Sequence, residues 1–253
     1  MMRMGLSFTR FFGAAVLVSL CCNRSLPAAT TDMLPALVGS GPSALINLIN
    51  PKHVMDRGQQ HGALFFIARV DPNGYPAFSR VWGTTKETEA LRDELKAKLR
   101  EARFIPAIYQ HRHVYAWFYG TLAFSVTDGK PHLRIFANQE LSELEKENDF
   151  IAPQPIWFPQ KVYDFAKWKD PSGGWASEEK PVETDMLLTV DGAGTVKDVR
   201  LERIIPADKK AYGDAALMIF RQRSYLPAFR NGKPVDSTTH VKFYFVPGWY
   251  HML

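Results

Sequence analysis

Two stretches of this chain that lie about 120 residues apart share one pattern. "FIPAIYQHRHV" occupies residues 104–114, and "YLPAFRNGKPV" occupies residues 225–235. In both, an aromatic residue stands two positions before a proline, which cannot lie in the interior of a helix. The residue just before the proline is restricted to extended conformations. The repeated pattern indicates that the chain contains two copies of a small module, each of which changes from helix to strand at this point.

The segments that precede the two stretches also correspond. Residues 64–82 and 187–204 each contain two runs of alternating apolar residues around a glycine-containing turn, which is typical of a β-hairpin. Val70 and Gly74 in the first hairpin match Val190 and Gly194 in the second at a spacing of 120. The correspondence therefore extends beyond the quoted stretches.

A helix is predicted between the hairpin and the proline in each copy. In the first copy Thr84 and Glu87 have the spacing of a capping box, and three leucines follow at intervals of four residues on one helical face. The strands predicted after the prolines cover residues 114–126 and 237–247. The fold class predicted is α+β, with two tandem ββαβ modules that each pack one helix on a small antiparallel sheet. The helical residues predicted to face the sheets are Leu91, Leu95 and Leu99 in the first copy and Tyr212, Ala216 and Phe220 in the second.

Five segments are predicted along the chain. They are a signal peptide (1–28), a segment leading into the first module (29–61), the first module (62–127), a connecting segment (128–183) and the second module (184–253). The leader has Arg3 and Arg10 before the apolar run "FFGAAVLVSLCC" and a small residue, Ala28, where cleavage is expected. Two alternatives stay open: the leader is retained as an anchor, or it is lipidated at Cys21 or Cys22.

Removal of the leader would change the charge and the cysteine content. The leader contains three arginines and no acidic residue, so 31 − 3 = 28 basic residues would remain against 26 acidic ones. A net charge of +2 gives little reason to expect nucleic-acid binding. Both cysteines also lie in the leader. A chain without them has no disulfide, zinc-thiolate site or cysteine nucleophile.

The motifs that carry chemistry are weak. His111 and His113 are the best metal candidates, because alternate residues of a strand share one face and zinc is often bound by histidines. Their position matches the "NGKP" turn of the second copy, however, so a solvated turn is the preferred interpretation. No Gly-x-Ser-x-Gly motif is present. Glu178 and Glu179 lie in a Gly- and Ser-containing loop and are interpreted as solvated charges. We therefore expect no catalytic residue, no metal and no cofactor.

The second copy resembles the C-terminal domain of the TonB energy-transducer family. The similarity is carried by "TVDGAGTVKDVRLERI", "DAALMIFRQRSYLPAF" and "RNGKPVDSTTHVKFYF" and covers residues 184–247. The first copy is similar more distantly over residues 62–126, with His111 and His113 in place of Gly232 and Pro234. The resemblance implies a two-layer α+β fold in the periplasm of a Gram-negative bacterium, where the domain grips an extended peptide of an outer-membrane receptor by strand addition. The chain departs from energy-transducing members because it has no long Pro/Lys/Glu-rich spacer.

The function predicted is that of a non-catalytic periplasmic protein that binds a partner by strand addition, in a process linked to TonB-dependent outer-membrane transport. The partner expected is a periplasmic or outer-membrane protein that offers a receptor-type strand, and the binding strand is expected at a sheet edge near the end of the chain. The residues predicted to bind it are Val241, Lys242, Phe243, Tyr244 and Phe245. Two alternatives stay open. The two copies could pair their own edges, or the protein could be a periplasmic enzyme or small-ligand binder with a site between the modules, lined by His111, His113 and residues 132–183.

Overall fold

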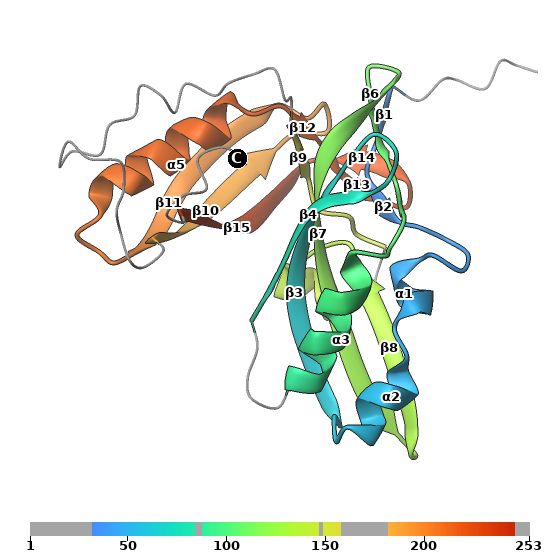
Figure 1. Cartoon of the computed structure of the whole chain (residues 1–253). Helices are drawn as coiled ribbons and strands as arrows, with labels where there is room; N and C mark the ends of the chain where they lie inside the picture. The colour runs from blue at the N-terminus through green and yellow to red at the C-terminus, as the bar shows by residue number, and fades with distance from the viewer. Residues whose placement is uncertain (1–31, 84–87, 147–148, 158–181, 246–253) are drawn as a thin grey trace, which may run out of the picture. The chain divides into compact units, whose positions relative to one another are not determined.

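The longest strand, β7 (Arg112–Thr127), organises the first half of the chain (Figure 1). The computed structural model describes residues 32–83, 88–146, 149–157 and 182–245. On one side β7 pairs antiparallel with β3 (His61–Val70), and β4 (Pro76–Trp82) follows β3 at the outer edge. On its other side β7 pairs in turn with β6 (Ala107–Tyr109), β9 (Gln154–Trp157) and β8 (Lys130–Phe136). The short strand β1 (Met33–Leu34) extends the sheet beyond β6.

Alternation along β3 separates the two faces of this sheet. Leu64, Phe66, Ala68 and Val70 are fully buried, whereas the residues between them are only partly buried. The helix α3 (Glu89–Leu99) covers this face with three fully buried leucines at the predicted positions: Leu91, Leu95 and Leu99. Two short helices, α1 (Leu45–Leu48) and α2 (Pro51–Asp56), add residues to the same core.

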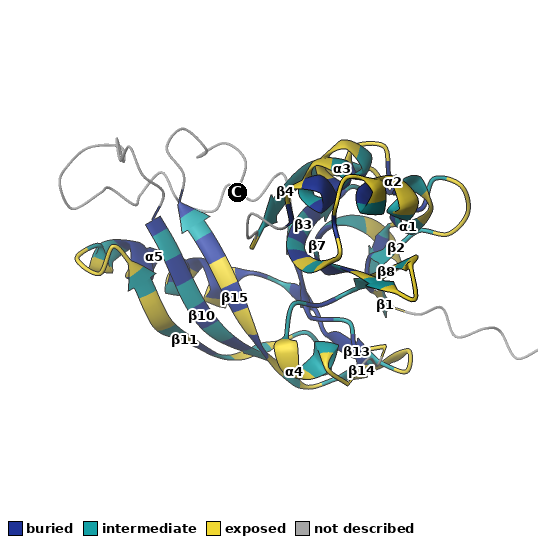
Figure 2. Cartoon of the chain, turned by 90° about the horizontal axis from the view of Figure 1, so that it is seen from below, coloured by how far each residue is buried: buried dark blue, intermediate teal, exposed yellow. Residues whose placement is uncertain are grey.

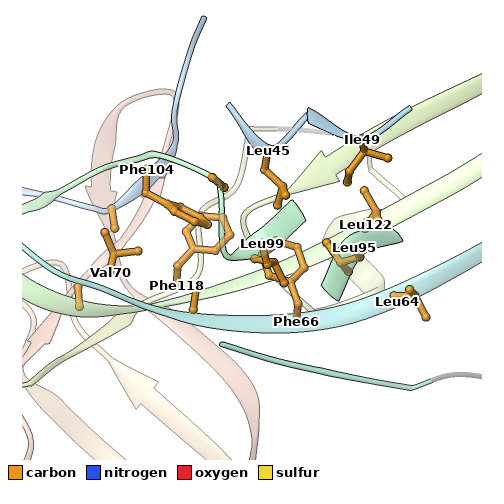
Figure 3. Packing of buried hydrophobic residues seen from close by; sticks show 14 of the residues in the cluster. Leu45, Ile49, Leu64, Phe66, Val70, Leu95, Leu99, Phe104, Phe118 and Leu122 are labelled. Atoms are coloured by element: carbon orange, nitrogen blue, oxygen red, sulfur yellow. The ribbon is translucent and has the colours of Figure 1, made fainter. Parts of the chain in front are cut away.

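This core is continuous from the helices to the sheet. Figure 3 shows the side chains of Leu95 and Leu99 beside those of Phe66 and Leu122, which belong to the same buried cluster. Complete burial of a side chain of this size contributes about 1.5–3 kcal/mol. The leucine periodicity read from the sequence therefore identifies the face of α3 that stabilises the fold.

A second, three-stranded sheet has the order β11-β10-β15. It consists of β10 (Val182–Val190), β11 (Val196–Ile205) and β15 (Ser237–Phe245), all antiparallel. The helix α5 (Lys210–Gln222) covers one face, and Tyr212, Ala216 and Phe220 are buried there as predicted. Figure 2 shows the resulting alternation of buried and exposed residues along β15.

One local arrangement recurs in both halves. Gly74 and Gly194 have φ values of +82° and +80°, and a Cβ at either position would lie 2.2 Å from a backbone carbonyl oxygen. The oxygen belongs to Phe104 in the first half and to Tyr225 in the second. Both aromatic residues stand two positions before the repeated proline. The repeated sequence pattern therefore reflects a hairpin turn that packs against the segment that follows the helix in each half.

The predicted fold class is wrong. The described structure is mostly β, with 49% strand and 21% helix, and the modules expected had one helix each on a small sheet. Five helices and an eight-stranded antiparallel sheet are present among the described residues. The difference arises because segments outside the two repeats also pair. The segment before the first repeat supplies β1, β2 (Leu37–Val38), α1 and α2, and the segment after it supplies β8, α4 (Leu141–Leu144) and β9.

Short strands complete the structure around the two prolines. β2 pairs with β5 (Phe104–Ile105), β12 (Tyr225–Leu226) pairs with β9, and β13 (Ala228–Arg230) pairs with β14 (Lys233–Val235). All described residues belong to one compact unit. None of the helices in the described part of the chain has the length and apolar character needed to cross a membrane. The predicted signal peptide and the capping box at Thr84 lie outside the described residues.

Candidate partner-binding strand edge

The five residues predicted to bind a partner lie consecutively on β15, at one edge of the three-stranded sheet. Within the described residues β15 pairs with β10 and with no further strand. Val241, Phe243 and Phe245 are 7–8% exposed and pack against α5, where the rings of Phe220 and Phe243 are 5.7 Å apart. Lys242 and Tyr244 point to the opposite face of the sheet. In the first half, by contrast, the corresponding predicted strand (114–126) lies within β7, which has described strands on both of its sides.

The backbone of β15 alternates between its paired and its unpaired side. The N–H of His240 donates to a carboxylate oxygen of Glu140 and so points away from β10. In an antiparallel ladder every second residue directs both its N–H and its C=O to the same side. The backbone groups of Lys242 and Tyr244 therefore also point away from β10, at the open edge.

Charged side chains fix the polar face beside this edge. Lys242 Nζ donates to Glu183 Oε1 at 2.8 Å and to Asp185 Oδ1 at 2.7 Å, and Arg203 Nε donates to Asp185 Oδ2 at 2.7 Å. Partial burial alone would raise the pKa of Asp185, but the hydrogen bonds from Lys242 and Arg203 outweigh it and lower that pKa. Asp185 is therefore ionised at neutral pH. The positive charge of Lys242 is already paired and is not available to a ligand.

The side chain of Tyr244 contacts β4 of the larger sheet. Its ring lies 6.4 Å from that of Trp82 in an edge-on arrangement, and the Arg80 guanidinium lies 4.4 Å from its centroid. Burial raises the pKa of Tyr244, which keeps the phenol neutral at physiological pH. Arg80 and Trp82 therefore cover the ring of Tyr244. The side chain of Tyr244 is half-buried, but no described strand pairs with the outward side of β15.

Glu140 is a site residue that the sequence did not indicate. Its second carboxylate oxygen lies 3.0 Å from His240 Nδ1, and Glu202 lies 3.6 Å from the other ring nitrogen. The hydrogen bond with Glu140 raises the pKa of His240. The two residues are 100 positions apart, and no local pattern marks Glu140 as a partner of β15. Glu140 accepts a hydrogen bond from the backbone N–H of His240, as a carbonyl oxygen of an added strand would.

The two candidate metal ligands lie on either side of the start of β7: His111 is in the turn between β6 and β7, and His113 is the second residue of β7 and pairs with Ile108 of β6. His111 has a positive φ of 61° and contacts Asp32, while His113 Nδ1 lies 3.1 Å from the carbonyl oxygen of Pro72. Among the described residues no group of three or more His, Cys, Asp or Glu side chains could bind a metal ion. Glu178 and Glu179 lie outside the described residues.

A small cavity lies between the two sheets, and neither His111 nor His113 lines it. Its volume is about 20 Å³. A cavity of that size has room for about one water molecule and not for a substrate. Tyr119 lies in its wall, and burial raises the pKa of this tyrosine to about 12, so it stays neutral at pH 7. Gln139, Glu140, Pro153 and Pro155 of the predicted connecting segment also contribute to the lining.

Comparison of the chain with protein-family models, with curated proteins and with solved structures finds no match. The resemblance of residues 184–247 to the TonB family stays a prediction. What the protein binds must therefore be inferred from the geometry of the strand edge itself.

Proposed function

We propose that this chain is a non-catalytic periplasmic protein that binds an extended segment of a periplasmic or outer-membrane protein by strand addition at β15. The observation that carries the proposal is the direction of the backbone at Lys242 and Tyr244. Their N–H and C=O groups point away from β10, and no described strand pairs with them. Unpaired edge groups of this kind are the usual site of strand addition. We place this binding in TonB-dependent outer-membrane transport, on the basis of the sequence resemblance alone.

The contact between Glu140 and His240 supports the same proposal. A carboxylate oxygen already accepts a hydrogen bond from the next outward-pointing N–H of the same strand. An incoming strand would continue this row with carbonyl oxygens in place of the carboxylate. The edge is therefore positioned to accept a partner from His240 towards the end of β15.

The number of available backbone groups sets the expected affinity. Lys242 and Tyr244 offer two N–H and two C=O groups, and each hydrogen bond contributes about 0.5–1.5 kcal/mol net. The sum is about 2–6 kcal/mol, from which the cost of ordering both partners must be subtracted. We expect a dissociation constant no tighter than about micromolar unless side chains of the partner contribute.

A pair of variants tests whether the backbone of the edge binds the partner. Tyr244→Pro removes one outward N–H, and proline is tolerated on an edge strand. Tyr244→Ala keeps that N–H but removes the same contacts with Trp82 and Arg80. With a photo-crosslinker at the exposed Thr238, wild type and Tyr244→Ala should capture the same partner in cells, and Tyr244→Pro should not. Circular dichroism should show that both variants are folded.

Two results would contradict the proposal. Undiminished capture by Tyr244→Pro would show that the edge N–H does not take part. Equal loss of capture in Tyr244→Ala and Tyr244→Pro would assign recognition to the tyrosine side chain and not to strand addition.

A further inference from the structure

Among the described residues, β4 is a second strand with an unpaired side, and that side forms one wall of a groove. The groove lies between α3 and β4, is lined by Ser79, Arg80, Val81, Lys96 and Arg100, and has a volume of about 380 Å³. Sites that bind ligands have volumes of about 300–1,000 Å³. Within the described residues β4 pairs only with β3, so its other side is unpaired. This groove lies on a different edge from β15 and does not depend on the function proposed for β15.

The groove carries positive charge that the described part of the protein does not neutralise. Lys96 of α3 and the C-cap residue of that helix, Arg100, are both exposed and stand four residues apart on one helical face. Like charges at this spacing weaken a helix. Lys98, on another face of the same helix, pairs with Glu101 at 3.1 Å, whereas neither Lys96 nor Arg100 has an ion pair within the described residues. The two charges are therefore free to meet an anion.

The register of β4 shows which of its groups face the groove. Val81 and Ser79 pair with Phe66 and Ala68, which face α3, so their side chains lie on the α3 side. Arg80 points to the opposite face, where its guanidinium contacts Tyr244. Arg80 must therefore line the groove chiefly with its main chain. One wall of the groove is a strand edge and the other is a pair of cations.

The spacing of the two cations matches that of an extended chain. Four residues of helix span about 6.0 Å, and two residues of strand span about 6.6 Å. Figure 1 shows α3 running alongside β3 and β4. The spacing of the cations along the helix and the spacing of side chains along a strand therefore run in the same direction. A strand beside β4 would direct every second side chain to Lys96 and Arg100. The side chains between them would lie on the face of Phe78 and Trp82.

We propose that the groove between α3 and β4 binds an extended acidic segment of a partner protein, in which carboxylate and apolar side chains alternate. The carboxylates pair with Lys96 and Arg100, and the apolar side chains lie on the side of Phe78 and Trp82. Charge complementarity identifies the occupant, because the groove presents two cations without a carboxylate partner in the described residues.

A labelled peptide, Thr-Glu-Val-Glu-Val-Glu-Thr, tests the proposal by fluorescence anisotropy with the full chain at low ionic strength. It should bind, and the matching peptide with glutamine for each glutamate should bind about tenfold more weakly, the effect of losing two surface ion pairs. The Lys96→Gln/Arg100→Gln double variant should lose the same factor. Lys98→Gln, on the same helix but outside the groove, should bind as wild type does. Added salt should weaken only the glutamate peptide.

Several outcomes would overturn the proposal. The two peptides could bind equally, or Lys98→Gln could weaken binding as much as the double variant, which would indicate diffuse charge attraction. Inorganic phosphate could bind more tightly than the peptide, which would make the groove a site for small anions. The double variant could self-associate while neither peptide binds, which would show that the charges only keep the edge from pairing. The variants at Lys96 and Arg100 leave the residues of β15 unchanged, and the test of β15 measures capture of a partner in cells, so the two tests can fail independently.

Discussion

At the scale of single residues, two glycines explain why the chain repeats itself. Gly74 and Gly194 adopt positive φ, and each lies so close to a carbonyl oxygen that a Cβ has no room. Asp71 and Asp191 fix the two turns in the same way, because Oδ1 of each accepts hydrogen bonds from two backbone N–H groups of its turn. The matching aspartates and glycines are therefore requirements of backbone geometry.

A glycine substitution separates the effect of the positive φ from that of the nearby carbonyl oxygen. Gly194→Ala should lower the free energy of unfolding by about 2–5 kcal/mol, from a strained φ of about 1–2 kcal/mol and overpacking of about 1–3 kcal/mol. Gly232→Ala is the matched control, since its φ is +69° and nothing lies within 4 Å of its Cβ position. Gly232→Ala should lower the free energy of unfolding only by the contribution of the strained φ, about 1–2 kcal/mol. Urea denaturation measures both, and equal losses would show that the contact with the Tyr225 carbonyl is unimportant.

At the scale of an element, an ionisable contact holds β15 at His240, just before the residues predicted to bind a partner. Glu140 binds both the backbone N–H and the ring of His240. The acidic groups around this ring are Glu140, Glu202 and Asp185. The hydrogen bond with Glu140 raises the pKa of His240 above its ordinary value of 6.5. The beginning of the candidate edge is therefore sensitive to pH.

The contribution of His240 to stability should change with pH in a direction that can be measured. A raised folded-state pKa contributes stability that is fully present below pH 6.5 and is lost as the pH rises through the folded value. The difference in unfolding free energy between wild type and His240→Gln should therefore be largest at acidic pH and decline above 6.5. In Glu140→Gln, NMR titration should find the pKa of His240 lowered relative to wild type. A pH-independent difference for His240→Gln would contradict this account.

At the scale of the whole molecule, β9 joins segments that are far apart in the sequence. It pairs with β7 and with β12, and its Gln154 reaches the segment between β1 and β2. Gln154 Oε1 accepts from the Ala36 N–H at 2.7 Å, and Gln154 Nε2 donates to the Ala36 carbonyl at 2.9 Å. Both residues are at most 1% exposed. One buried amide therefore acts as a strand partner for Ala36.

Loss of this amide should destabilise the protein as a whole. Gln154→Leu keeps a similar volume but leaves the buried N–H and C=O of Ala36 without this partner, at about 1–3 kcal/mol for each group. We expect the free energy of unfolding to fall by about 2–6 kcal/mol in a single cooperative transition. Gln222→Leu, at an exposed glutamine that ends α5, should change it by less than about 0.5 kcal/mol. Calorimetry and urea denaturation should agree, and a loss below 1 kcal/mol in Gln154→Leu would mean that water replaces the amide.

The features that the sequence determined by itself are those set by neighbouring residues. The alternation in residues 64–82 and 187–204 predicted the hairpins of β3 with β4 and of β10 with β11, and the structure confirms both. The helical spacing predicted six residues of α3 and α5 to be buried, and the burial of all six is also confirmed. Alternation and helical period are local, so one chain segment is enough to reveal them. The predicted site residues likewise fall on one strand because their pattern is local.

The features that only the tertiary structure decided involve pairing between distant segments. The sheet around β7 recruits β1, β8 and β9 from outside the repeats, which made the predicted fold class wrong. Glu140, Arg80 and Trp82 join the candidate site from positions about 100 residues or more before β15. The groove of Lys96 and Arg100 exists only because α3 lies along β4, whose outer side pairs with no described strand. Strand order and side-chain contacts depend on which edges meet once the core is buried, and that choice leaves no periodic signal in the sequence.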